Sequence, residues 1–436
     1  MGKRRNKNKT DREDFAVFSS ISHRNGVSFF LIVKVDIDDS DDVSCVTHST
    51  LDCDLRNTTV HNISDEEDLS DTVTPSDQLD SFLDKASNKN VSIRLAAMGN
   101  MKTLLTKRYI AVDLEKWTAT LTDIIDKALR KTDEEVKIAA SLSVLISIQF
   151  GEKIASEMEP VVSFLCQLSI DPSRNIQLRS HCARSVALCT ILCLEQPALI
   201  LASVAALRSI WFAEKSNAAS VKLFCVALSG WSLLIHHGGQ EALRVALSDE
   251  PKLSTFLDGT QMHLLRSSYS LKLEMRLSAG KALAVLHEAA VATFGDKYRF
   301  PNQQHLLDIF ANLTTDSVKF RAKKDRKIQK FTFRQIYAFI KDQEVPVFDV
   351  RFGNETLSIK SCRKKLLYEY VCGVLHGGIN SHLKMNPILR EQFDLGPTTE
   401  IFPTKIEKPQ RIAIQNAINK TRDLQRLKQR DKRIIY

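Results

Sequence analysis

The sequence predicts a mainly α-helical chain: an armadillo- or HEAT-like α-solenoid, then a small α+β C-terminal domain and a basic C-terminal helix. Three observations support this fold class. The 436 residues include only 15 Gly and 11 Pro, and few of either fall between residues 76 and 300, which favours helices over a many-turned β fold. A similar segment recurs at the length of a helical repeat. The positive charge gathers near one end of the chain.

We divide the chain into four parts: a disordered segment at 1–76, the helical repeats at 77–317, the C-terminal domain at 318–397 and the basic helical tail at 398–436. The first part has a basic head, followed by acidic runs at Asp36–Asp42 and Asp65–Asp68. High charge with little apolar matter predicts disorder. The basic head is either a nuclear signal or a solvated tail. The apolar patch at residues 27–35 is too short to span a membrane and receives no assignment.

The repeat is marked by a cation placed before a run of small or apolar residues, at Arg94, Lys137, Arg179, Lys222 and Arg276. The spacings are 43, 42, 43 and 54 residues, and a period of about 40 to 47 residues is typical of armadillo and HEAT repeats. The longer last interval contains a polar, Gly-bearing stretch at 236–259. The recurring cation has two interpretations. It lines a concave face for an anionic partner, or, as we favour, it opens a helix and pairs with a nearby acid, as Asp133 would pair with Lys137.

The C-terminal domain combines helical and strand patterns. Thr332–Asp342 reads as an amphipathic helix with Phe333, Ile336, Tyr337 and Ile340 on one face. Residues 345–361 alternate apolar and polar side chains around Gly353-Asn354, which predicts a β-hairpin. We expect two further helices, at Arg363–Val374 and Ile379–Phe393.

Charge suggests a polyanionic partner. From Lys319 to the end, 26 cations accompany 12 acids, a net charge of +14 against +9 for the whole chain. One basic end is the electrostatic footprint of a nucleic-acid binder, although a solvated tail or a localisation signal has the same composition. The candidate RNA-binding residues of the tail are Arg411, Lys420, Arg422, Arg426, Lys428, Arg430, Lys432 and Arg433. A second basic patch comprises Arg321, Lys323, Lys324, Arg326 and Lys327.

No catalytic constellation is recognisable. His181, Cys182, Cys189 and Cys193 resemble a metal-ligand set, but the cysteines follow one apolar helical face, which favours core packing over zinc. Nine Cys without a C-x-x-C pair indicate a reducing compartment. The sequence has no P-loop, no G-x-S-x-G and no H-E-x-x-H. We therefore expect a non-enzyme with no catalytic residue, metal, cofactor, small-molecule substrate or membrane partner.

Several segments of the sequence resemble those of a known protein family. KKDRKIQKFTFRQIYAFI (323–340), VRFGNETLSIKS (350–361) and HLKMNPILREQFDLGP (382–397) are similar to the C-terminal domain of the interferon-related developmental regulator family. RLAAMGNMKTLL (94–105), TLTDIIDKALRK (120–131) and the apolar run at 139–151 resemble its armadillo-like region. Residues 11–70 show no such resemblance.

The resemblance implies a non-enzymatic regulator of gene expression. It implies two activities: binding to idle ribosomes, where the C-terminal helix occupies the mRNA path and represses translation, and co-regulation of transcription through deacetylase-containing corepressors. The cation-rich tail favours the ribosome and its rRNA as partner, because phosphate contacts need cations and little apolar burial. The alternative is a nuclear scaffold whose repeats bind corepressors. We accordingly expect the protein in the cytoplasm and, for the second role, in the nucleus.

Overall fold

The computed structural model describes residues 75–213, 220–258, 269–315, 323–352 and 355–398, together with Asn416 and Lys420. Helices dominate these residues, and two strands form one small sheet. The predicted mainly α-helical solenoid is therefore confirmed. The segment predicted to be disordered, 1–76, lies outside the described residues apart from its last two, as does most of the basic tail.

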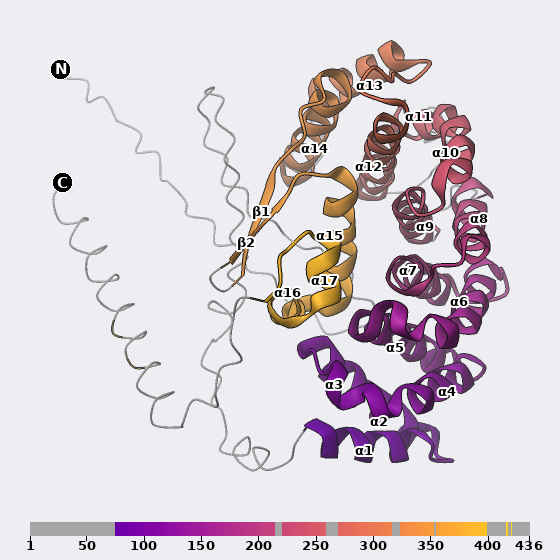
Figure 1. Ribbon diagram of the computed structural model, residues 1–436. Helices are drawn as coiled ribbons and strands as arrows, with labels where there is room; N and C mark the ends of the chain where they lie inside the picture. Colours follow the sequence, from indigo (N-terminus) through magenta and orange to yellow (C-terminus); the bar gives the residue numbers. More distant parts are fainter. Residues whose placement is uncertain are drawn as a thin grey trace, which may run out of the picture.

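The helices of the solenoid form two curved rows (Figure 1). The inner row comprises α2 (Val91–Lys107), α5 (Asp133–Phe150), α7 (Ile176–Cys193), α9 (Val221–Leu234) and α12 (Tyr269–Phe294). The outer row comprises α4 (Thr118–Leu129), α6 (Ala155–Ile170), α8 (Pro197–Ala213), α10 (Gly239–Ser248) and α11 (Glu250–Asp258). The two ends are closed by α1 (Pro75–Ala86), α3 (Ala111–Leu114), α13 (Gln303–Thr315) and α14 (Lys323–Asp342), and short 3-10 turns lie at η2 (Glu115–Trp117) and η3 (Gly151–Ile154).

The five recurring cations all lie on the inner row, one on each of its helices. The period in the sequence therefore measures the step from one inner helix to the next. The longer last step accommodates two outer helices, α10 and α11, instead of one.

The inner helices form the core because neighbours cover them on several sides. Helices α5, α7 and α9 are buried along most of their length. Trp211 of α8 packs on Trp231 of α9, with ring centroids 4.9 Å apart. The stretch Asp133–Ile170 is apolar and long enough to cross a membrane, but 72% of its most apolar window is buried inside the molecule, as expected of core helices.

The chain then turns back into the concave side of the solenoid. Strands β1 (Phe348–Phe352) and β2 (Glu355–Ile359) pair antiparallel with Phe348 opposite Ile359. They are followed by α15 (Cys362–Leu375), η5 (His376–Gly378), α16 (Ile379–Met385) and α17 (Pro387–Gln392). The single helix expected at 379–393 is two helices, because Pro387 begins α17 and Asn386 caps it with its side-chain oxygen.

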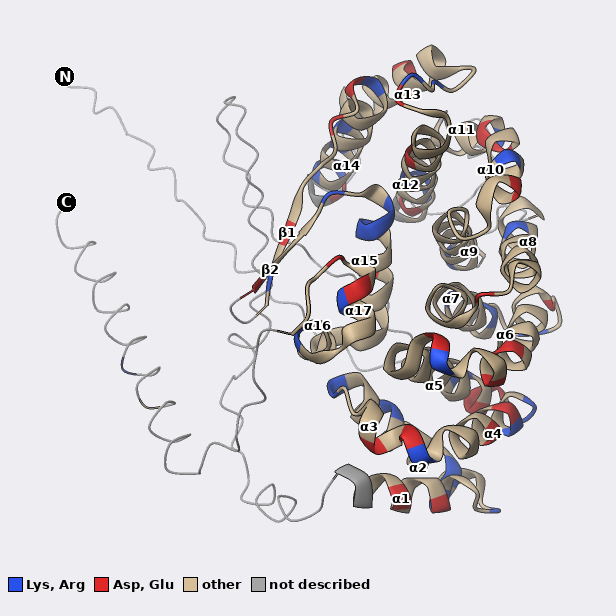
Figure 2. Ribbon diagram, in the orientation of Figure 1, with Lys and Arg blue, Asp and Glu red and all other residues tan. Residues whose placement is uncertain are grey.

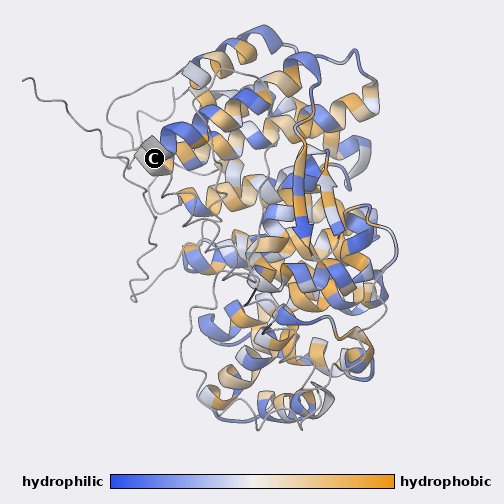
Figure 3. Cartoon of the chain, turned by 90° about the vertical axis from the view of Figure 1, so that its left-hand side faces the viewer, coloured by the Kyte–Doolittle hydropathy of each residue, from blue (hydrophilic) through white to orange (hydrophobic). Residues whose placement is uncertain are grey.

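Helix α15 lies across the inner row and contacts α2, α5, α7, α9 and α12 (Figure 1). Viewed from that side, the hairpin and α15–α17 cover the middle of the solenoid (Figure 3). The C-terminal segment thus occupies much of the surface that a curved solenoid usually offers to partners.

Candidate nucleic-acid interface

The basic patch predicted at residues 321–327 belongs to the beginning of α14. Lys323 and Lys324 are its first residues, Arg326 and Lys327 follow in the same turns, and Arg321 lies outside the described residues. Lys327 is exposed, whereas Arg326 is half-buried and its Nε is buried without a hydrogen-bond partner. Within this patch, Lys327 is therefore the described side chain most accessible to an anion.

The cations of α14 continue beyond the predicted patch. Lys327, Lys330, Arg334 and Lys341 recur at helical spacing, and Lys and Arg mark the helix along its length (Figure 2). Phe333, Ile336, Phe339 and Ile340 are buried on the other side. A helix of 20 residues is about 30 Å long, so α14 presents an extended row of positive charge. The patch predicted from the sequence omitted Lys330 and Arg334. Their spacing could have identified them, because Lys330 follows Lys327 by three residues and Arg334 follows Lys330 by four, which places all three on one side of a helix.

The apolar face of α14 is broader than predicted. Tyr337 is half-buried and packs against the core, and Phe339 is buried beside the predicted residues. The Lys341 ammonium lies 5.4 Å from the centroid of the Tyr337 ring. Tyr337 therefore lies at the edge of the apolar face, where it contacts both the core and a cation of α14.

Of the eight tail candidates, only Lys420 lies among the described residues, where it is helical and exposed. Arg411, Arg422, Arg426, Lys428, Arg430, Lys432 and Arg433 lie outside them. The structure does fix where the tail leaves the body. Arg390, which is 2% exposed, donates from Nε to the carbonyl of Gly396 and from Nη2 to that of Pro397, at 2.7 and 3.2 Å.

The same Arg390 holds the hairpin. Its guanidinium pairs with Glu355 of β2, with Nη2 and Oε2 2.7 Å apart. This guanidinium makes two hydrogen bonds to one carboxylate and also donates to the two carbonyls at the start of the tail. Such charge-assisted bonds fix both the carboxylate and the carbonyls in position. Arg390 therefore ties together the hairpin, α17 and the start of the tail.

The C-terminal segment docks through donors that reach backbone carbonyls of the inner row. Tyr370 donates to the carbonyl of Val226 at 2.6 Å, His382 Nε2 to that of Leu105 at 3.1 Å, and Asn386 Nδ2 to that of Ile148 at 2.7 Å. Burial lowers the pKa of His382 to about 4, so the imidazole docks in its neutral form. A Cβ at Gly378 would lie 1.9 Å from the carbonyl oxygen of Thr106, so this contact requires glycine.

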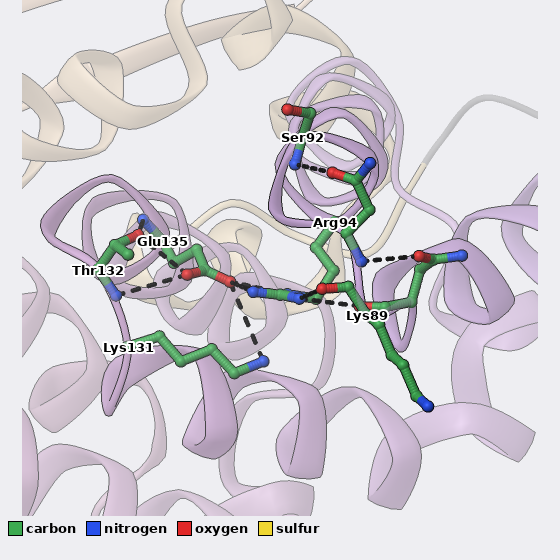
Figure 4. A network of polar contacts seen from close by, with 8 residues as sticks. Lys89, Ser92, Arg94, Lys131, Thr132 and Glu135 are labelled. Carbon is green, nitrogen blue, oxygen red and sulfur yellow. Dashed lines mark hydrogen bonds and ion pairs between the residues drawn. The ribbon is translucent and has the colours of Figure 1, made fainter.

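The first recurring cation is structural. The Arg94 Nε donates to Glu135 Oε1 at 2.9 Å, and its Nη1 donates to the carbonyls of Asn88 and Lys89 at 2.9 and 2.8 Å (Figure 4). Glu135 also belongs to a capping box with Thr132 at the start of α5. Burial raises the pKa of Glu135, but the hydrogen bonds from Arg94 and Thr132 outweigh it and hold the pKa below its ordinary value.

The other recurring cations differ from one another. Arg179 donates to the carbonyl of Ser169 at 2.9 Å, which is again structural. The expected pairing of Asp133 with Lys137 is wrong, because Asp133 pairs with Arg174 at 3.1 Å. Within the described part of the chain no ion pair involves Lys137 or Lys222, so these two fit the other interpretation, in which cations line the concave face.

The cysteines of α7 are packed in the core. Cys182, Cys189 and Cys193 are each 0% exposed, and burial raises the pKa of the Cys182 and Cys193 thiols to about 12. Among the residues that the structure describes, no group of three or more His, Cys, Asp or Glu side chains could hold a metal ion. These thiols therefore behave as small apolar side chains.

Comparison with known proteins identifies relatives along most of the chain. Mouse (Mus musculus) interferon-related developmental regulator 2 is 28% identical over 415 residues, which cover 90% of this chain and 89% of the relative. Human (Homo sapiens) interferon-related developmental regulator 1 is 27% identical over 367 residues, 82% of this chain and 80% of the relative. A designed armadillo repeat protein aligns with 58% of this chain and 99% of its own, at 15% identity and a TM-score of 0.37.

Two family models match. The interferon-related developmental regulator model covers residues 44–341, and the interferon-related protein conserved region covers residues 386–434. The first match begins before Arg94, so the expectation that residues 11–70 lack a family resemblance is wrong from residue 44 onward. The second match includes the end of the C-terminal domain and nearly all of the basic tail. The chain therefore belongs to the interferon-related developmental regulator family.

Proposed function

We propose that this family member, a regulator of gene expression, binds the ribosome through rRNA phosphates and represses translation. In this proposal the cations of α14 and of the basic tail contact phosphates, and the solenoid with its docked C-terminal segment acts as a non-catalytic scaffold. The observation that carries the proposal is the basic row Lys327, Lys330, Arg334 and Lys341, which lies on the opposite side of α14 from its buried face; Lys330 is half-buried and the other three are exposed.

The arrangement suits phosphate better than a protein groove. A protein-binding amphipathic helix inserts an apolar stripe into its partner, but the apolar side of α14 is already buried against its own molecule. The side that remains free is cationic, and cation–phosphate contacts need little apolar burial. The tail adds further cations by sequence, with ten Lys and Arg against three acids at 405–436.

The alternative, a nuclear scaffold that holds corepressors in the concave face of the repeats, has less support. Helix α15 lies along that face and contacts five inner helices. A protein partner would have to use the outer row or the part of the concave face that the C-terminal segment does not cover.

The test is sedimentation of the full-length tagged protein through a sucrose gradient with ribosomes. We expect co-sedimentation by the wild type, and strong loss for the variant Lys327→Gln/Lys330→Gln/Arg334→Gln and for a chain lacking residues 405–436. Lys153→Gln/Lys297→Gln, which changes two exposed lysines elsewhere, is the matched control and should co-sediment normally. If the wild type stays at the top of the gradient, or if the tail deletion and the α14 variant both sediment like the wild type, the proposal is wrong.

A further inference from the structure

A second group of cations lies on the concave face, beside the C-terminal segment. It comprises Lys102 of α2, Lys137 of α5, His181 and Arg184 of α7, and Lys222 of α9, and we call it the concave cation shelf. His181 and Lys222 are exposed, and the other three are half-buried. The Arg184 guanidinium stacks on Tyr370 of α15, 5.5 Å from the ring centroid. None of the five has an ion-pair partner within the described ranges.

The shelf residues lie close enough to act on one another. Although the His181 side chain is exposed, its pKa falls to about 4, because neighbouring groups displace part of the water around the ring and because Arg184, Lys102, Lys222 and Lys137 repel a proton on it. Burial, Lys102 and Arg184 likewise lower the pKa of His376 in η5. One carboxylate is nearby: Lys222 lowers the pKa of Glu274 on α12, although burial raises that pKa overall.

The four helices that carry the shelf supply few carboxylates to neutralise its positive charge. Helices α2, α7 and α9 contain no Asp or Glu, and the first turn of α5 directs Asp133 to Arg174 and Glu135 to Arg94. Helix N-termini carry partial positive charge, and Lys222 lies in the first turn of α9. Cations on a concave, low-dielectric surface focus a positive potential. The shelf therefore carries a positive charge that the carboxylates of these four helices do not neutralise.

We propose that the concave cation shelf binds the chain's own acidic segment, residues 36–71. That segment contains twelve carboxylates and a single cation, Arg56. It ends four residues before α1 begins at Pro75, and α1 packs on α2, the first helix of the shelf. The start of α1 lies on the side of the solenoid where α16 is seen (Figure 1).

Length and tethering both suit this occupant. Neighbouring helices are about 8 to 10 Å apart, so four inner helices span roughly 30 Å, which about nine extended residues bridge. Residues 36–71 are several times longer. A short flexible tether gives an effective concentration in the millimolar range, so each carboxylate–cation contact can be weak and the segment still occupies the shelf. Bound there, it would exclude other polyanions from the concave face.

The test uses full-length protein and a fluorescent synthetic peptide of residues 36–74, without RNA. The acceptor is a full-length chain in which each of the twelve Asp and Glu residues at 36–71 is replaced by Asn or Gln. These substitutions leave its concave cation shelf free to bind the peptide. We expect this acceptor to bind the peptide at least tenfold more tightly than the wild type does, because the wild-type shelf is occupied. Adding Lys102→Gln/Lys137→Gln/Lys222→Gln to the acceptor should weaken binding at least tenfold, and adding Lys153→Gln/Lys297→Gln should not.

A second measurement needs no substitution. A carbodiimide joins carboxylates to amines in direct contact, so we expect wild-type crosslinks from residues 36–71 to Lys102, Lys137 or Lys222. Crosslinks confined to the basic tail would overturn the proposal. So would equal peptide affinity for wild type and acceptor, or shelf-dependent binding of an oligouridylate but not of the peptide. These readouts contain no ribosome, so their failure is distinct from failure of the proposed function.

Discussion

The covered and open parts of the concave face differ in how their polar groups are partnered. Under α15–α17, three buried contacts are hydrogen bonds between a neutral donor and a backbone carbonyl of the inner row, made by Tyr370, His382 and Asn386. On the open shelf, Lys137 and Lys222 have no described ion-pair partner. A buried polar group must be satisfied where it lies, whereas a solvent-accessible cation keeps its hydration and stays available. The comparison separates contacts that build the fold from charges available for binding.

The largest effect should come from breaking a buried charge pair. In Glu135→Ala, the Arg94 guanidinium, whose side chain is 11% exposed, loses its carboxylate. We expect the free energy of unfolding to fall by about 3 kcal/mol or more, because a buried charge is left uncompensated. Urea denaturation measures this. Glu134→Ala, at the exposed neighbouring position, should change stability by less than about 0.5 kcal/mol, and equal losses would refute the structural role of the pair.

The second-largest effect is expected from Gly378→Ala, which disrupts the contact between η5 of the C-terminal segment and α2 of the inner row. A Cβ there would lie 1.9 Å from the Thr106 carbonyl oxygen, a backbone atom that cannot move aside as a side chain would. We expect a loss of about 3 kcal/mol, the upper end for overpacking, together with release of α15–α17 seen as faster hydrogen exchange. Gly377→Ala is the matched control, since nothing lies within 4 Å of its Cβ position. A Gly378→Ala protein with wild-type stability would mean that η5 does not approach α2 this closely.

The third prediction concerns His287, a buried basic side chain, and the dependence of stability on pH that it causes. His287 is 0% exposed among Tyr298, Phe300 and Phe339, and neither ring nitrogen has a hydrogen-bond partner in the described structure. Burial and Arg299 lower its pKa to about 4. The unfolded chain, with a pKa of about 6.5, binds the proton first, so stability is full above that pH and is lost as the pH falls toward 4.

By pH 5 this loss amounts to about 2 kcal/mol for His287 alone. His287→Phe should remove it, so that thermal melts of the variant fall less between pH 7 and pH 5 than those of the wild type. Replacing the exposed His305 by Gln serves as control. An identical pH dependence in His287→Phe and wild type would contradict the neutral, buried imidazole.

The smallest effect on stability is expected from substitutions in the concave cation shelf, the open part of the concave face. In the acceptor chain, whose residues 36–71 lack carboxylates, Lys137→Gln/Lys222→Gln should leave the melting curve within about 0.5 kcal/mol of that parent chain, with any shift toward greater stability at low salt, because like charges are removed. Lys281→Gln provides the contrast, since Lys281 pairs with Glu369 of α15 at 2.6 Å, and should cost up to about 1 kcal/mol. A loss of several kcal/mol in the double variant would show that these lysines support the fold and are not free for binding.

Local patterns in the sequence predicted the repeats well. The interval between Arg94, Lys137 and the later cations located the inner row, and alternation around Val350 and Leu357 located the hairpin. The same local reasoning paired Asp133 with Lys137, whereas the fold pairs residues 41 apart, Asp133 with Arg174 and Arg94 with Glu135. In a solenoid each helix packs on the next repeat, so partners lie one period away.

The docking of α15–α17 in the concave face could not be predicted in this way. It depends on donors such as Tyr370 and His382, which reach carbonyls 144 and 277 residues earlier. Backbone carbonyls are present at every residue, so no sequence pattern identifies the ones used. The cationic side of α14 was only partly predicted, because the basic cluster at 321–327 is dense in sequence, whereas Lys330 and Arg334 are separated by uncharged residues and join the row only through the helical turn.

The salt dependence of ribosome binding tests the proposed function most directly. Each phosphate contact that is lost should reduce the slope of log affinity against log salt concentration by about 0.7 to 0.9. For Lys327→Gln/Lys330→Gln/Arg334→Gln we therefore predict a slope shallower by about 2 to 3 than that of the wild type, and an unchanged slope for Lys153→Gln/Lys297→Gln. Equal slopes for the wild type and the α14 variant would contradict the assignment of α14 to rRNA phosphate.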